Sequence, residues 1–303
     1  MPKAFESFDF SRYDLVICSS SSCAKGVITP SDVPHIAYVH TPMRYAWDLF
    51  FDYRKRSGRI TRFFMDKWMS EIRAWDYISS QRIDKIIANS KYISRRIKKF
   101  WNLDAEVIYS PVNLKRFTPI KNPSLDYYVA FSRLVPYKRI DIALDACKAL
   151  GKNLVVIGSG SEEKSLKKRA ASAKNITFTG RISDEKLCAY LQNCKALIFC
   201  AEEDFGLVPL EAQACGRPVI AYGKGGACET VKDGKTGVFF SEQTADSAKE
   251  AIERFEALDK KGAFKSETIA QHAASFSEER FIREFKAAVE SVQKTLKQQT
   301  VHQ

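Results

Sequence analysis

The 303-residue sequence has no long apolar run, since no stretch reaches the roughly 18–20 residues that a membrane-spanning helix needs. Its first ten residues are polar and acidic-aromatic, and they lack the apolar segment of a secretory signal peptide. We therefore expect a cytoplasmic protein. Hydrophobic residues make up 45% of the chain, which is enough to build the cores of two ordinary domains.

The sequence also lacks the cysteine spacing of a metal site or a disulfide framework. Its eight cysteines include no C-x-x-C pair, and the four histidines do not cluster near them. We therefore expect no metal site. A position among apolar residues is typical of buried, reduced thiols, and it is shared by five of the cysteines: Cys18, Cys147, Cys194, Cys200 and Cys215.

Glycine is scarce in the first third, where only Gly26 and Gly58 precede residue 117, against twelve glycines after it. A glycine-rich phosphate-binding turn is therefore not expected there. The same third is basic: residues 1–116 hold 20 Lys and Arg against 12 Asp and Glu, a net charge of +8 out of +12 for the chain. This charge favours phosphate-rich partners in general. No recognisable nucleic-acid-binding module is present, so we expect no nucleic-acid partner.

From residue 127 onward, short β-rich runs alternate with helical stretches. Continuous apolar strands separated by helices indicate a parallel sheet that is covered on both faces. In such sheets, ligands bind at the carboxyl ends of the strands, near a switch point in strand order. We expect strands at 127–132, 153–157, 176–179, 196–200, 218–221 and 237–240, and helices at 139–150, 162–173 and 184–193.

The first third contains too few strand candidates for a complete doubly wound domain. They lie at 15–18, 36–39, 85–88 and 106–109. A linker with two prolines follows at 113–124, and helical spacing of apolar residues near the end of the chain predicts a long final helix. The expected organisation is an incomplete Rossmann-like domain at 1–118, a complete Rossmann-like domain at 119–276, and a helix at 277–303 that packs back toward the first domain.

The most informative segment is Glu203-Asp204-Phe205-Gly206-Leu207-Val208-Pro209-Leu210-Glu211, which follows the apolar run at 196–200. Gly206 permits close backbone approach, and Pro209 suits the first turn of a helix. The free N–H groups of that turn can hold a phosphate or an oxyanion. One carboxylate can then face a sugar hydroxyl and the other a ribose diol. Two glutamates at this spacing would be ordinary surface residues without the strand–loop–helix context.

A second segment, Phe131-Ser132-Arg133-Leu134-Val135-Pro136-Tyr137-Lys138-Arg139, joins a strand to a helix. The strand is expected to end at Arg133, and the helix is expected to begin near Lys138. Lysine and arginine usually provide ordinary surface charge. Two cations at the carboxyl end of a strand can also neutralise a diphosphate leaving group, and their position favours this functional interpretation.

These two segments resemble the signature of retaining glycosyltransferase family 4, the "glycosyl transferases group 1" domain, whose hallmarks are S-R-x-x-x-x-K and E-x-F-G-x-x-x-x-E. Further matches follow in chain order at Gly158-Ser159-Gly160, Thr179-Gly180-Arg181, 214–221 and 225–237. The resemblance covers roughly residues 125–240. It implies an α/β protein of the GT-B type, with two Rossmann-like domains facing a cleft, the first of them incomplete here.

The resemblance also implies roles for single residues. Arg133 and Lys138 would bind the donor diphosphate, and Glu203 would contact the donor sugar. These three residues and His40 are the expected catalytic residues, and Glu211 would bind the ribose. The other expected substrate-binding residues are Gly158 in the pocket wall, Arg181 beside the nucleobase, and Phe205, Gly206, Leu207 and Val208.

His40 opens the segment His40-Thr41-Pro42-Met43-Arg44-Tyr45-Ala46-Trp47-Asp48 after an expected strand. A lone histidine there is usually structural, but in this family such a histidine faces the donor sugar. The longer stretch resembles bacterial O-antigen-type mannosyltransferases, which act in lipopolysaccharide and other polysaccharide biosynthesis. The resemblance implies transfer of a hexosyl group with retention, mannosyl from GDP-mannose being expected. It implies a glycan or polyprenyl-pyrophosphate-linked acceptor and neither metal nor cofactor.

The first strand and glycine-rich loop of the family are not found at the start of this sequence. We therefore expect an N-terminally truncated chain. Two interpretations of its function stay open: an active hexosyltransferase, or a catalytically weak or inactive nucleotide-sugar-binding fragment or subunit.

The stretch at 45–75 interleaves basic residues with aromatic ones. One interpretation is an amphipathic helix pair that covers the first sheet. The other is a contact with a lipid surface or a lipid pyrophosphate, which would place the protein peripherally on the inner face of the cell membrane. The sequence alone does not choose between them.

Overall fold

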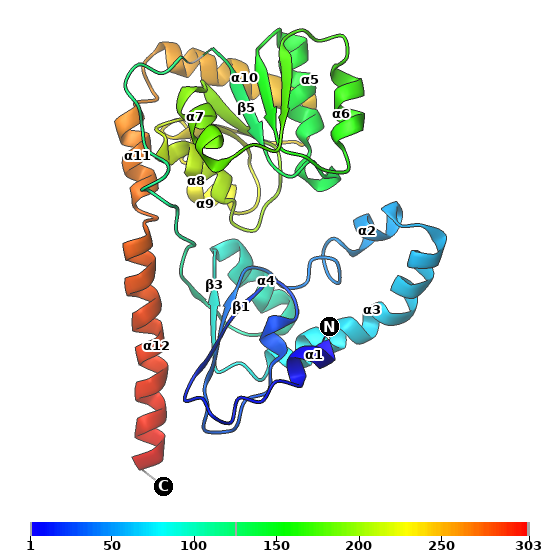
Figure 1. The fold of residues 1–303 in the computed structure, drawn as a ribbon, viewed down its shortest axis with the longest axis vertical. Coiled ribbons are helices and arrows are strands. Elements are labelled where there is room, and N and C mark those ends of the chain that lie inside the picture. The colour runs from blue at the N-terminus through cyan, green and yellow to red at the C-terminus, as the bar shows by residue number, and fades with distance from the viewer. Residues whose placement is uncertain (1, 125, 302–303) are drawn as a thin grey trace. The chain divides into compact units, whose positions relative to one another are not determined.

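The computed structural model describes residues 2–124 and 126–301. The chain forms two compact units, one made of Met1–Tyr109 and Phe281–Gln303 and the other of Ser110–Arg280. Each unit is an α/β structure with a parallel sheet of its own (Figure 1). The division precedes the proline-containing segment at 113–124, which therefore lies within the second unit.

The first unit contains a four-stranded parallel sheet in the order β1-β2-β3-β4. Every residue of β2 is buried, as expected for an apolar strand between two neighbours. All four strands confirm the sequence expectation, with ends that differ by at most two residues: β1 (Val16–Ser20), β2 (His35–Val39), β3 (Lys85–Ala88) and β4 (Glu106–Val107).

The helices of the first unit have clear local causes. Helix α4, for example, begins at the N-cap Ser90, whose hydroxyl accepts a hydrogen bond from the N–H of Ile93 at 3.1 Å. It ends at Asn102, which adopts the left-handed conformation with φ of 56°. Its buried Ile97 and Trp101 pack against the sheet. The described helices before the linker are α1 (Pro2–Glu6), η1 (Ala24–Gly26), α2 (Phe50–Arg56), α3 (Arg59–Ser80) and α4 (Lys91–Trp101).

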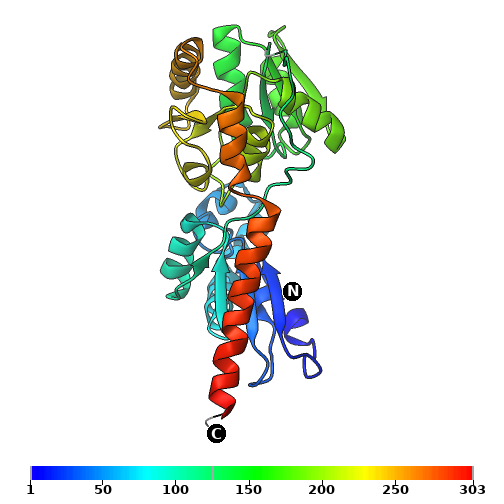
Figure 2. The ribbon, with the colours of Figure 1, turned by 90° about the vertical axis from the view of Figure 1, so that its left-hand side faces the viewer.

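The last helix, α12 (Glu278–Val301), belongs to the first unit from Phe281 onward. Its Phe281 and Phe285 pack with Ile36 and Tyr38 of β2, in a cluster that includes the buried Ala288. Figures 1 and 2 show α12 running along the four-stranded sheet. The helix therefore supplies one apolar layer of the first unit.

The second unit contains a six-stranded parallel sheet in the order β10-β9-β8-β5-β6-β7. The chain runs outward from the central β5 through β6 and β7, then crosses to β8 on the other side of β5. The switch point in strand order therefore lies between β5 and β8. The strands are β5 (Tyr128–Phe131), β6 (Leu154–Ile157), β7 (Ile176–Gly180), β8 (Ala196–Phe199), β9 (Val219–Tyr222) and β10 (Gly237–Phe240).

Helices cover both faces of this sheet (Figure 1). On one face, Leu144, Ile252 and Phe255 pack with strand residues such as Val156 and Ile198 in a continuous core. That face carries α5 (Ile140–Leu150), α6 (Glu163–Ala170) and α10 (Ala245–Lys260). The opposite face carries α7 (Asp184–Asn193), α8 (Leu207–Ala214), α9 (Ala227–Thr230) and α11 (Ser266–Ala274).

The cysteines behave as small apolar residues. All eight are free thiols, and the five that the sequence places among apolar neighbours are buried. Only Cys228 of the eight is exposed. Within residues 2–124 and 126–301, no helix combines the length and the hydropathy that crossing a bilayer requires.

Candidate active site

The two chemical motifs follow neighbouring strands of the second unit. Strand β5 leads through a loop to the short 3₁₀-helix η2 (Pro136–Lys138), and β8 leads through residues 200–206 to α8. Since β5 and β8 pair in parallel at the switch point, both loops leave the same edge of the sheet. This is the edge at which sheets of this kind bind ligands.

Lys138 and Glu203, one residue from each motif, form an ion pair across this edge. The Nζ atom of Lys138 donates to Oε1 of Glu203, and the two side chains are only 16% and 19% exposed. The Lys138 ammonium also lies 5.2 Å from the centre of the Tyr137 ring. This largely buried ion pair can therefore exchange partners with a ligand: the ammonium can bind an anionic group, and the carboxylate can bind a hydroxyl group.

The backbone after β5 differs from the sequence expectation in one respect. Lys138 ends η2, and Arg139 then takes the left-handed conformation with φ of 52°, so α5 begins at Ile140 rather than near Lys138. The Arg139 guanidinium bonds to Asp141 at 3.1 Å. Lys138 therefore lies in the loop segment between β5 and α5, as the last residue of η2. Arg133 lies exposed in the same loop and forms no ion pair within the described chain.

The loop after β8 enters α8 through Gly206, whose φ of 79° is a conformation that favours glycine. No side chain caps this helix, so the first-turn N–H groups are open to a ligand, with the positive end of the helix dipole behind them. Leu207 is 42% exposed and Val208 is partly buried. Phe205 is buried and its ring lies 6.1 Å from Phe276, so a ligand at this loop would meet only its backbone.

Gly225 and Gly226 support the loop that contains Glu203 through backbone contacts. The N–H of Gly226 donates to the carbonyl oxygen of Glu203 at 2.8 Å, and Gly225 forms a bridge with Glu203. A Cβ atom on Gly226 would lie 2.3 Å from the Cα atom of Phe205. Any side chain at Gly226 would therefore displace the loop that positions Glu203.

Glu211 lies in the second turn of α8. Its Oε2 atom is buried and has no hydrogen-bond partner among the described residues. Burial raises the pKa of Glu211 to about 7, although the positive charge of Arg116 acts in the opposite direction. A buried carboxyl oxygen without a donor is a favourable acceptor for a ligand hydroxyl.

The glycines after β6 pack tightly against the loop after β5. A Cβ on Gly158, where φ is 128°, would lie 1.9 Å from the carbonyl oxygen of Ser132. A Cβ on Gly160 would lie 2.2 Å from that of Leu134. Their small size therefore has a packing reason, independent of any ligand. Arg181 is exposed directly after β7, the strand at the edge of the sheet.

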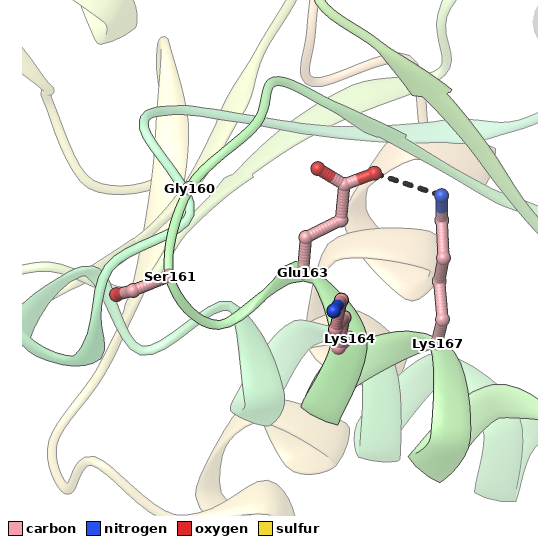
Figure 3. Close-up of a pocket in the computed structure, with 5 residues that line it drawn as sticks. All are labelled: Gly160, Ser161, Glu163, Lys164 and Lys167. Atoms are coloured by element: carbon pink, nitrogen blue, oxygen red, sulfur yellow. Dashed lines mark hydrogen bonds and ion pairs between the residues drawn. The ribbon is translucent and has the colours of Figure 1, made fainter.

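A pocket of about 560 Å³ opens beside this glycine turn. Figure 3 shows Glu163 and Lys167 pointing toward one another, with 2.7 Å between Oε1 and Nζ, while the hydroxyl of Ser161 points away from them. Gly158 does not line this pocket, and its expected place in the wall of the donor pocket stays a prediction. The lining residues are Gly160, Ser161, Glu163, Lys164 and Lys167.

His40 belongs to the first unit, whereas the other expected site residues belong to the second. It follows β2, and its N–H donates to the carbonyl oxygen of Ser20 at 2.8 Å. Its Nε2 atom lies 2.8 Å from Oγ of Ser19, and the Tyr38 ring meets its edge at 5.2 Å. Burial lowers the pKa of His40, so the ring is neutral at physiological pH.

The sequence alone did not identify Ser19 as the partner of His40. The contact could have been expected, because Ser19 lies in β1 and His40 follows β2, and these two adjacent parallel strands end at the same edge of the sheet. The sequence also did not assign Gly225 and Gly226 to the support of Glu203, since that contact depends on how two loops pack.

Solved structures with a similar fold include sucrose-phosphate synthase from Thermosynechococcus elongatus, with a TM-score of 0.77, 19% identity and coverage of 93% of this chain and 74% of that one. HepE from Anabaena in complex with UDP-glucose gives a TM-score of 0.67 at 19% identity, covering 86% of this chain and 72% of the other. These similarities show the fold: two Rossmann-like halves with parallel sheets, as in GT-B glycosyltransferases.

The family is shown by a second finding. Residues 113–271 match the family profile described as "Glycosyl transferases group 1", and residues 1–116 match the one described as "Glycosyltransferase Family 4". Because the first match covers more than half of the chain, the protein belongs to the glycosyl transferases group 1 family.

Among its relatives, an uncharacterized glycosyltransferase of Methanocaldococcus jannaschii is 32% identical over 172 residues, which are 56% of this chain and 48% of the relative. A GDP-mannose-dependent alpha-(1-6)-phosphatidylinositol monomannoside mannosyltransferase of Mycobacterium tuberculosis is 33% identical over 156 residues, 46% of this chain and 39% of the relative. In these comparisons the chain spans about half the length of its curated relatives, or less.

Proposed function

We propose that this chain binds a nucleotide sugar at the carboxyl ends of β5 and β8 and transfers its hexosyl group to an acceptor hydroxyl. The observation that carries the proposal is the Lys138–Glu203 ion pair. It joins the two motifs at the switch point, at the edge from which the uncapped α8 begins. The family membership supports the same reaction class.

The chemistry follows from an exchange of partners. A bound diphosphate would draw the Lys138 ammonium away from Glu203, and Arg133 on the same loop would add a second cation. Both charges, with the N–H groups at the start of α8, would stabilise the negative charge that develops on the departing diphosphate. Glu203, freed from Lys138, would accept a hydrogen bond from a sugar hydroxyl, and Glu211 would accept one from the ribose.

We propose GDP-mannose as the donor, because a relative from Mycobacterium tuberculosis is named as GDP-mannose-dependent. The HepE structure with UDP-glucose makes a UDP-sugar the donor to test beside it. Retention of the anomeric configuration and a glycan or polyprenyl-pyrophosphate-linked acceptor follow from the motif resemblance. Four further expectations stay predictions: the donor-sugar contact of His40, the base contact of Arg181, the absence of a metal or cofactor requirement, and the cytoplasmic location.

A transfer assay tests the proposal. The purified chain is supplied with GDP-mannose or UDP-glucose and a panel of glycan and lipid-linked acceptors, and NMR gives the anomeric configuration of the product. Lys138→Ala and Glu203→Ala should each lower the rate by at least about 100-fold, since each removes a group that acts on the reacting donor. Their melting temperatures should stay within about 2 °C of wild type.

Lys148→Ala on α5 and Glu250→Ala on α10 are matched controls, because both side chains are exposed outside the two motif loops. Near-normal transfer by Lys138→Ala or Glu203→Ala would contradict the proposed roles. Donor binding without transfer to any acceptor would favour the alternative of an inactive nucleotide-sugar-binding subunit.

A further inference from the structure

Helix α2 and the first half of α3 form an arm of the first unit, residues 50–70, which extends away from the four-stranded sheet (Figure 1). The second half of α3 is anchored in the unit, where Asp76, Ser79 and Ser80 are buried. The aromatic-basic stretch of the sequence is thus a helix pair, of which only part packs on the rest of the unit.

Contacts within the arm hold its two helices together. The guanidinium of Arg54 bonds to both carboxylate oxygens of Asp66, at 2.7 and 2.8 Å. Arg62 donates to the carbonyl oxygens of Arg54 and Lys55, at 2.9 and 2.8 Å. These bonds satisfy carbonyl groups at the end of α2. They also show that Arg54 and Arg62 form hydrogen bonds within the arm itself.

The first half of α3 carries two apolar stripes. Met65 and Met69 face the unit and pack in a cluster with the buried Met43. The other stripe is exposed: Ile60 by 76%, Phe63 by 62%, Phe64 by 43% and Trp68 by 44%, with the last two rings stacked at 4.9 Å. Phe51 of α2 is also exposed, by 69%. Exposed apolar side chains gathered in this way mark an interaction surface.

The charge of the arm indicates what that surface meets. Residues 50–70 hold six Lys and Arg against two Asp, a net charge of +4. Lys55, Arg56, Arg59 and Lys67 are exposed. Aromatic rings beside basic side chains suit the boundary of an anionic bilayer, where rings enter the headgroup region and cations meet phosphates. A second copy of the chain would instead bring two positive faces together.

We propose that the exposed stripe of the arm docks the protein on an anionic phospholipid surface, with Ile60, Phe63, Phe64 and Trp68 entering the interface. Lys55, Arg56, Arg59 and Lys67 provide the electrostatic attraction. Docking requires only this surface. The further inference that docking brings the protein to a lipid-linked acceptor rests on the proposed function.

Flotation with lipid vesicles tests the docking without any transfer assay. The protein should bind vesicles that contain roughly one third phosphatidylglycerol at least about tenfold more tightly than vesicles of phosphatidylcholine alone, and added salt should weaken the binding. Two paired variants should each lower this binding at least about tenfold: F63S/W68S removes apolar contact, and K55Q/R56Q removes charge without touching a buried side chain.

Two controls match these variants. Tyr13→Ser removes an aromatic ring that is 58% exposed elsewhere in the first unit, and K260Q/K261Q removes two exposed charges in the second. Both should bind vesicles as the wild type does. Equal binding by the wild type and both arm variants would overturn the proposal. A concentration-dependent dimer that F63S/W68S abolishes, without vesicle binding by the wild type, would assign the stripe to self-association instead.

Trp68 gives a direct readout of insertion, because it is the exposed one among the four tryptophans, Trp101 being buried and Trp47 and Trp75 partly buried. Vesicles with brominated acyl chains should quench its fluorescence in the wild type and in Tyr13→Ser. The K55Q/R56Q variant should lose most of this quenching at the same lipid concentration. Unquenched fluorescence in vesicle-bound wild type would show that the stripe stays in water, and would also overturn the proposal.

Discussion

At the scale of single residues, the second unit contains both a paired set of charges and a buried carboxyl oxygen that has no hydrogen-bond partner among the described residues. Lys138 and Glu203 neutralise each other, whereas the Oε2 atom of Glu211 is buried without a donor among the residues that the structure describes. The placement of both Lys138 and Glu203 at one edge could be predicted from sequence, because the carboxyl ends of all parallel strands in a sheet lie at the same edge. Their pairing could not, since it depends on β5 and β8 being neighbours. Nor could the burial of the Glu211 oxygen, because it depends on how α8 packs on its neighbours.

Glu211 makes stability depend on pH. Its pKa in the folded chain, about 7, lies above its ordinary value of 4.5. Between these two pH values the unfolded chain binds fewer protons at this site, so stability is fully present below pH 4.5 and falls as pH rises through 7. Full ionisation should cost up to about 3 kcal/mol, an upper figure because the side chain is only partly buried.

The variant Glu211→Gln should remove this cost. In urea unfolding it should match the wild type near about pH 4 and exceed it by up to about 3 kcal/mol near pH 8. The same variant should bind a nucleotide sugar more weakly, because an amide is a poorer hydrogen-bond acceptor than a carboxylate. Glu250→Gln, exposed on α10, is the matched control. Parallel stability curves for Glu211→Gln and the wild type would refute the altered pKa.

At the scale of elements, the sequence predicted the six strands and the three named helices of the second unit to within three residues at each end. Apolar runs such as 85–88 and 237–240 match strands β3 and β10 without a shift. The expected start of α5 at 139 lies one residue before the observed Ile140, because the left-handed Arg139 separates η2 from α5. The extent of α3 to Ser80 was missed because its last turn is held by a buried ionic contact that no local pattern reveals.

That contact is formed by Lys25 of η1, which is only 1% exposed. Its ammonium lies 3.1 Å from Oδ1 of Asp76 and donates to Ser79 Oγ at 2.5 Å, near the ring of Trp101 at 5.0 Å. The other carboxylate oxygen of Asp76 accepts hydrogen bonds from Trp101 and Trp47, at 2.7 and 2.8 Å. This network joins η1, α3 and α4 of the first unit.

Breaking one side of the network should be costly. Lys25→Met leaves the buried Asp76 carboxylate without its cation, and we expect a loss of about 3–5 kcal/mol in the unfolding free energy of the first unit. The double variant K25M/D76N should recover a good part of that loss, because the uncompensated charge is gone. Urea unfolding followed by tryptophan fluorescence measures both. A double variant less stable than Lys25→Met alone would contradict this account.

At the scale of the whole molecule, the chain is two α/β units, each built on a parallel sheet. Alternation of apolar runs and helices was enough to predict the complete second sheet. It could not give the strand order, because order depends on the crossover from β7 to β8. The aromatic-basic stretch was left open by the sequence, since its helical spacing allowed either a buried or an exposed stripe, and the structure contains both.

The central claim is that the edge of the sheet between β5 and β8 is a nucleotide-sugar site. Calorimetric titration of the chain with GDP-mannose, with UDP-glucose in parallel, tests it most directly. We predict one site for one of the two donors, weakened at least about tenfold by Arg133→Ala and by Glu211→Ala and unchanged by Lys148→Ala. No binding of either donor, or equal affinity in all of these variants, would contradict the claim.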